Sequence, residues 1–145
     1  MTRLPLIALL SLLFLGSCAT APQDLLDPNC RPVSYHLLLT VRDGQVDAFR
    51  AVMKEMVAAT KNEPGTLVYE WFLTADGKTC HINEHFRDTA AHAAHGEGFK
   101  KFAERFLACV EIKGMTVFGD PEDAARERLE RLEPEYIGAI GGFRR

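Results

Sequence analysis

Two β-rich runs that flank Asp76-Gly77 constrain the fold of this chain most. Asp-Gly between two such runs predicts a β-hairpin with a two-residue turn, and counting outward from that turn places Tyr69 opposite Glu84. Side chains alternate along a strand, so one hairpin face is apolar except for Glu84 and the Tyr69 hydroxyl. A core-facing carboxylate is costly unless it is paired, so Glu84 requires a partner. That face carries Tyr69, Trp71, Leu73, Cys80, Ile82, Glu84 and Phe86.

The segments around the hairpin alternate between strand and helix patterns. Strands are expected at about 33–41 and 110–118, a helix at about 45–60, and a second helix from Asp88, which suits an N-cap. Gly96 and Gly98 are expected to interrupt that second helix. The order β-α-β-β-α-β predicts an α+β, ferredoxin-like fold, with an antiparallel sheet and both helices on one face.

The N-terminal segment reads as a targeting signal rather than as part of the fold. An apolar run ends in Leu15-Gly16-Ser17-Cys18, which resembles the lipobox of bacterial lipoproteins. This favours lipidation at Cys18 over simple cleavage after Ala21, where Pro22 would follow the scissile bond. We therefore expect a signal peptide (1–17), a tether (18–32), one domain (33–119), and a C-terminal helix with a Gly-rich tail (120–145). The protein would be anchored in the cell envelope on the periplasmic side, with Ala19 favouring the outer membrane.

Charge and cysteine content limit the partners. The formal net charge is −3 and no basic stripe is present, which argues against nucleic acid. After Cys18, three cysteines remain: Cys30, Cys80 and Cys109. In the strand order 4-1-3-2, the starts of the strands near Cys80 and Cys109 lie about 9.6 Å apart. That separation exceeds disulfide reach, so no bridge between them is expected.

His95 is the expected partner of Glu84. On the second helix it shares a side with Ala91, which should face the sheet and the strand face carrying Tyr69 and Glu84. A buried carboxylate can fix the tautomer of an imidazole or take a phenolic proton itself. The alternative is a buried polar network that only fixes the helix on the sheet. Trp71 likewise suits either a wall for a flat substrate or plain core packing.

A metal site is not expected. His81, Asn83 and His85 alternate on the other strand face, and His81 and His85 lie about 13 Å apart, too far to share one ion. His92 and His95 are three apart on a helix and could meet, but a third ligand is not apparent.

A family resemblance adds to this interpretation. The run Glu63-Pro64-Gly65-Thr66-Leu67-Val68-Tyr69-Glu70, followed by Glu84, Phe86, Asp88, Ala91, His95, Phe99 and Phe102, resembles the antibiotic biosynthesis monooxygenase (ABM) family, which includes quinol monooxygenase-like proteins. The resemblance covers about residues 33–118. It implies a dimeric α+β barrel, in which two sheets close face to face in a homodimer.

The resemblance also implies an activity, the oxidation of quinols or phenols with O2 and no cofactor. Glu84 and His95 would then be the acid–base pair with Tyr69 in the catalytic site, and Trp71, Asn83 and Phe99 would contact a small aromatic substrate. Two other classes of function stay open. The same cavity could bind a small molecule without catalysis, or the chain could be a structural envelope lipoprotein.

Overall fold

The computed structural model describes residues 31–142. Its elements in chain order are β1 (Val33–Val41), α1 (Val46–Thr60), β2 (Thr66–Leu73), β3 (Thr79–Phe86), α2 (Thr89–Cys109), β4 (Val110–Phe118), α3 (Asp123–Leu129), a 3-10 turn η2 (Glu130–Leu132) and β5 (Glu135–Ile137). Cys18, Cys30 and the predicted signal and tether lie outside the described residues, apart from positions 31 and 32. No helix within residues 31–142 has the length and apolar character needed to cross a bilayer.

The sheet has the predicted ferredoxin-like topology with one strand added. Its order is β2-β3-β1-β4-β5, and β1 to β4 pair antiparallel. The hairpin register is as predicted, because Tyr69 pairs with Glu84 and Leu73 with Cys80. The short β5 pairs in parallel with β4 and makes the sheet mixed. This strand was not predicted, because the tail containing it was expected to be a helix followed by glycine-rich coil.

The hairpin turn is longer than the predicted two-residue turn. The Thr74 N–H donates to the Thr79 carbonyl at 2.9 Å, so the strands close one pair earlier and residues 75–78 form the loop. The Asp76 carboxylate accepts from the Thr74 hydroxyl at 2.6 Å and from the Lys78 N–H at 3.0 Å, and Gly77 has a φ of 73°. The register is unchanged because the predicted turn Asp76-Gly77 and the observed loop 75–78 are centred on the same two residues.

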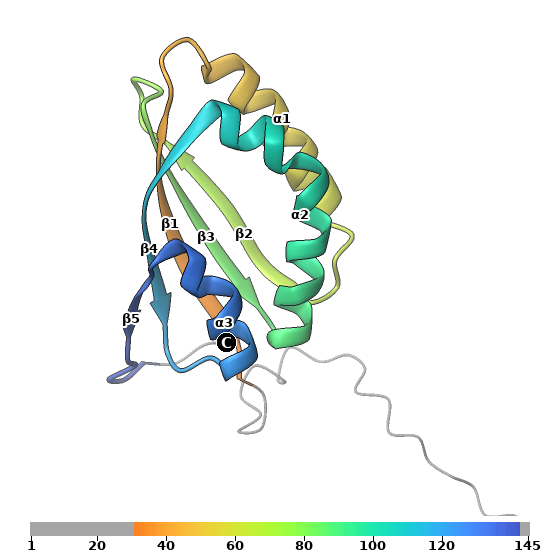
Figure 1. Cartoon of the computed structure of the whole chain (residues 1–145), viewed down its shortest axis with the longest axis vertical. Helices are drawn as coiled ribbons and strands as arrows, with labels where there is room; N and C mark the ends of the chain where they lie inside the picture. Colours follow the sequence, from red (N-terminus) through yellow and green to blue (C-terminus); the bar gives the residue numbers. More distant parts are fainter. Residues whose placement is uncertain (1–30, 143–145) are drawn as a thin grey trace, which may run out of the picture.

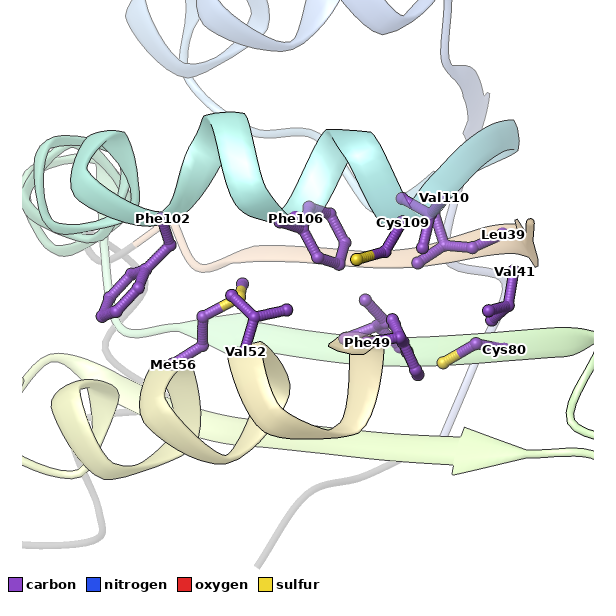
Figure 2. Packing of buried hydrophobic residues seen from close by; sticks show 11 residues of the cluster. Leu39, Val41, Phe49, Val52, Met56, Cys80, Phe102, Phe106, Cys109 and Val110 are labelled. Carbon is purple, nitrogen blue, oxygen red and sulfur yellow. The ribbon is translucent and has the colours of Figure 1, made fainter. Parts of the chain in front are cut away.

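Both long helices cover the same face of the sheet (Figure 1). Apolar side chains from α1 and α2 meet those of the sheet in the main core, which includes Leu39, Val41, Phe49, Val52, Met56, Cys80, Phe102, Phe106, Cys109 and Val110 (Figure 2). As predicted, Asp88 caps α2, since its side chain accepts the Ala91 N–H at 2.7 Å. Cys80 and Cys109 are buried and unpaired, also as predicted.

The expected interruption of α2 at Gly96 and Gly98 is wrong. The helix continues through both glycines to Cys109. Glycine lowers helix stability without forbidding the helix, so packing along α2 overrides its low propensity. Gly98 also has a spatial role, because a Cβ built there would lie 3.0 Å from Glu63 Oε1.

The C-terminal segment completes the helix-covered face of the sheet. Ala125 and Leu129 of α3 are buried in a second core cluster with Val33, Tyr35, Phe86, Met115 and Val117. In Figure 1, α3 lies over the end of the sheet that α1 leaves uncovered. The opposite sheet face carries exposed apolar side chains, including Phe72 (51% exposed) and Phe118 (42%). Among the described elements, no helix covers that face (Figure 1).

Candidate active site

His95 lies between two carboxylates. Its Nδ1 is 2.8 Å from Glu63 Oε2, and its Nε2 is 3.3 Å from Glu84 Oε2. The Tyr35 hydroxyl donates to the same Glu84 oxygen at 2.7 Å. The result is a continuous polar chain, Tyr35–Glu84–His95–Glu63, at the boundary between α2 and the sheet.

Three strands, the α1–β2 loop and a helix bring these groups together. Glu84 of β3 pairs across the sheet with Tyr35 of β1 on one side and with Tyr69 of β2 on the other, so all three side chains share the helix-facing side. Because α2 begins at the Asp88 cap, His95 lies over these three side chains. The Tyr69 and His95 rings meet edge to face, with centroids 5.3 Å apart.

A close approach of the backbone fixes the position of α2. A Cβ built on Gly65 would lie 2.3 Å from the Ala91 Cβ, so only glycine fits where the start of β2 passes the first turn of α2. The Gly65 carbonyl also accepts the Arg87 N–H at 2.9 Å. Gly65 and Ala91 of the family-like motif thus share one role, which is to let α2 pack against the start of β2.

Burial shapes the acidity of the site. The pKa of Glu84 is raised, chiefly because burial penalises its charged form, while His95 and the Tyr35 hydrogen bond act in the opposite direction. Burial, followed by the Glu84 charge, also raises the pKa values of Tyr35 and Tyr69, so both phenols stay protonated at neutral pH.

The two carboxylates contact the His95 ring in different ways. The Glu63 Oε2 atom accepts the Thr66 hydroxyl at 2.8 Å and is hydrogen-bonded to His95 Nδ1 at 2.8 Å. On the other side of the ring, Glu84 Oε2 lies at 3.3 Å from Nε2, which is an ion-pair distance. Glu63 therefore fixes the orientation of the ring, and Glu84 is in electrostatic contact with it.

A small pocket opens beside this chain, between α1 and α2. It is lined by Met56, Ala59, Thr60, Glu63, Tyr69, His95, Gly98, Phe99 and Phe102. Its enclosed space is about 10 Å³, close to the volume needed for one water molecule. Glu84 and Tyr35 do not line it, so a ligand would meet Glu63, His95 and Tyr69 first.

The predicted site residues fall into three groups. Glu84, His95 and Tyr69 come together on the helix side of the sheet, and Phe99 lies in the pocket wall. Trp71 packs in the core instead, with its ring 5.9 Å from those of Phe49 and Phe106, and it does not line the pocket. Asn83 pairs with His36 and Glu70 on the opposite sheet face, away from the pocket.

Tyr35 and Glu63 are site residues that the sequence reasoning did not single out. Tyr35 stands in an alternating strand, but its place beside Glu84 depends on the register between β1 and β3, for which no turn signal exists. Glu63 lies in the α1–β2 loop and was named only as the first residue of the run that resembles the family. Within residues 31–142, no three or more His, Cys, Asp or Glu residues are arranged to hold a metal ion.

Comparisons with known proteins agree with this fold. The profile of the family described as "Antibiotic biosynthesis monooxygenase" matches residues 32–111. No curated protein sequence matches the chain significantly.

Among solved structures, MupZ from Pseudomonas fluorescens is similar, with a TM-score of 0.70 and 21% identity over 79% of this chain and 95% of its own. Rv0793 from Mycobacterium tuberculosis has a TM-score of 0.55 at 21% identity, over 65% of this chain and 99% of its own. SnoaB from Streptomyces nogalater, a cofactor-independent oxygenase, has a TM-score of 0.53 at 18% identity, over 63% of this chain and 94% of its own. At these identities the structures share a fold with the chain.

Proposed function

The chain belongs to the antibiotic biosynthesis monooxygenase family, and we propose that it oxidises a small quinol or phenol with O2 without a cofactor. The observation that carries this proposal is the contact of His95 with Glu84, at 3.3 Å, beside a pocket lined by aromatic rings. SnoaB, which has the same fold, is a cofactor-independent oxygenase.

The chemistry requires an electron-rich anion. Transfer of the phenolic proton to a carboxylate of the site leaves an anion that can transfer an electron to O2, and recombination of the two radicals forms a carbon–oxygen bond. The proton returns to the resulting peroxide, and loss of water then leaves a carbonyl. Overall, a substrate carbon that carries two hydrogens in its keto form gains one oxygen atom, and the other oxygen atom leaves as water. Electrons therefore come from the substrate alone.

In this proposal Glu84 and His95 place a positive charge at the pocket when it is needed. A proton held on Glu84 keeps the pair neutral before the reaction. Its transfer to His95 Nε2 would place an imidazolium beside the anion that forms on the substrate and stabilise that anion. Tyr69 keeps its proton and offers a hydroxyl in the pocket wall.

The test is oxygen consumption with a panel of hydroquinones and hydroxynaphthalenes in chelator-treated buffer. We expect turnover by the unmodified protein and a loss of at least 100-fold in Glu84→Gln and His95→Gln, both with folded circular dichroism spectra. Glu97→Gln on the exposed side of α2 is the matched control and should retain full activity. Absence of oxygen consumption with every substrate, or full activity in both site variants, would overturn the proposal.

A second candidate role is structural. The pocket has space for about one water. The polar chain from Tyr35 to Glu63 is hydrogen-bonded at both ends and joined by the His95–Glu84 contact, which favours a network that only holds α2 on the sheet. In that case Glu84→Gln and His95→Gln would lower the melting temperature, and no substrate of the panel would be oxidised by any form of the protein.

A further inference from the structure

We propose that Glu63 is the residue that contacts the ligand directly and makes this pocket select neutral hydroxyl donors over anions. The inference uses the pocket of the proposed function but concerns binding, so it is testable without turnover. It rests on the exposure of Glu63, on the direction of its free oxygen, and on the charge of the pocket lining.

Glu63 is the member of the polar chain closest to solvent. Its side chain is 22% exposed, against 6% for Glu84 and 10% for His95. It lines the pocket, whereas Glu84 is behind His95 and does not. A ligand that enters between α1 and α2 therefore meets the Glu63 carboxylate before it can meet the buried one.

The Glu63 carboxylate is held by one oxygen only. Oε2 accepts both the His95 ring nitrogen and the Thr66 hydroxyl, each at 2.8 Å. Oε1 takes part in neither bond and lies toward Gly98, where a Cβ would come within 3.0 Å of it. Gly98 also lines the pocket, so the missing side chain leaves the free oxygen accessible from the ligand space.

The lining determines which ligand this oxygen accepts. Met56, Ala59, Phe99 and Phe102 supply apolar walls, and no lysine or arginine within residues 31–142 lines the pocket. Two carboxylates share the single cation that His95 can provide, so the site carries net negative charge. An anionic ligand would be repelled, while a neutral hydroxyl can donate to Oε1.

Glu63 then also serves as the immediate proton acceptor. The phenolic O–H bond breaks, an O–H bond forms on Glu63 Oε1, and the electron pair stays on the substrate oxygen beside the His95 ring. Because the pocket has space for about one water, an aromatic ring can enter only if side chains of the lining move aside.

The chain contains a built-in reporter for such binding. Trp71 is the single tryptophan, and its ring lies edge-on to Tyr69 with centroids 5.4 Å apart. Tyr69 in turn lines the pocket. The indole N–H resonance of Trp71 in an NMR titration therefore follows events in the pocket as one isolated signal.

The experiment is an anaerobic titration with methylhydroquinone and, separately, with 2,5-dihydroxybenzoate at pH 7, so that no oxidation occurs. We expect the neutral quinol to bind at least tenfold more tightly, and this ratio to fall below threefold in Glu63→Gln. Glu63→Asp keeps the charge and should keep the preference, and Glu97→Gln should match the unmodified protein. If Glu63→Gln is poorly folded, the two ligands are compared on the unmodified protein and on Glu63→Asp. This comparison still tests whether the pocket prefers the neutral ligand.

The proposal is overturned if the carboxylated ligand binds as tightly as the quinol, if Glu63→Gln keeps the full preference, or if neither ligand shifts the Trp71 signal. Selective binding without oxygen consumption would leave this inference standing and refute the proposed oxygenase activity. Oxygen consumption without selective binding would support the proposed oxygenase activity and refute this inference.

Discussion

Replacement of His92 by phenylalanine should make the protein more resistant to acid. His92 of α2 is buried between the rings of Tyr35 and Phe86, with centroids at 5.9 and 5.4 Å. Its Nδ1 has no hydrogen-bond partner within the described part of the chain. Burial, with smaller contributions from the charges of His95 and Arg128, lowers its pKa to about 4. A ring of similar shape without nitrogen fits the same aromatic surroundings.

The sign and the size follow from proton linkage. In the unfolded chain His92 binds a proton near pH 6.5, whereas the folded protein resists protonation of His92 until about pH 4. The stability from neutral, buried His92 is therefore complete above pH 6.5 and is lost as the pH falls from 6.5 to 4. The interval corresponds to about 3 kcal/mol, at 1.36 kcal/mol for each pH unit. Glu84 acts in the opposite direction, because its raised pKa lets the folded protein take up a proton first.

Urea unfolding of the unmodified protein and of His92→Phe between pH 7 and pH 4 separates the contribution of His92 from that of Glu84, because both proteins contain Glu84. At pH 7 the variant should match the parent or exceed it by about 1 kcal/mol, since an unpaired buried nitrogen is removed. At pH 4 its advantage should grow by about 3 kcal/mol. The stability of His92→Leu relative to the unmodified protein should rise by the same amount between pH 7 and pH 4, from a lower value at pH 7. A constant difference across this pH range would refute the reasoning.

Three further predictions concern packing, assembly and targeting. Gly65→Ala should cost about 2–3 kcal/mol because its Cβ meets Ala91, whereas Gly96→Ala, with open space around it, should stabilise α2 by about 0.5–1 kcal/mol; equal effects in thermal unfolding would contradict the packing argument. The exposed sheet face should make the protein a homodimer that Phe72→Glu dissociates, and light scattering that gives a monomer for the unmodified protein would disprove this. Cys18→Ala should abolish membrane association in cell fractionation, and a mature protein without lipid would show that the targeting prediction is wrong.

Local patterns determined the parts of the fold that the sequence could predict. The alternation around Asp76-Gly77 gave the pairing of Tyr69 with Glu84 even though the turn itself is longer, because a symmetric loop leaves the register unchanged. Asp88 was recognised as a cap because an N-cap depends on the next three residues only. The predicted helix interruption at Gly96 and Gly98 is wrong because the low helix propensity of glycine is outweighed by packing along the whole of α2.

Non-local geometry determined what the sequence could not show. Tyr35 reaches Glu84 only because β1 and β3 are neighbours in one register, and no sequence signal encodes that register. Glu63 joins the site because a loop passes Gly98, an approach visible only in three dimensions. β5 was missed because three residues before a glycine-rich tail carry no measurable period.

The addition of β5 has a consequence for how copies of the chain can meet. Without it, β4 would be an outer strand with a row of unpaired N–H and C=O groups, a template on which another chain can add. β5 occupies that row from Thr116 to Phe118, and the Gly119 N–H closes it with a bond to the Ile137 carbonyl at 2.8 Å. Loss of the segment after Gly119 would expose this hydrogen-bonding edge together with the apolar surface beneath α3. The C-terminal extension therefore protects this end of β4 from the addition of another strand and leaves the exposed face of the sheet as the surface expected to mediate self-association.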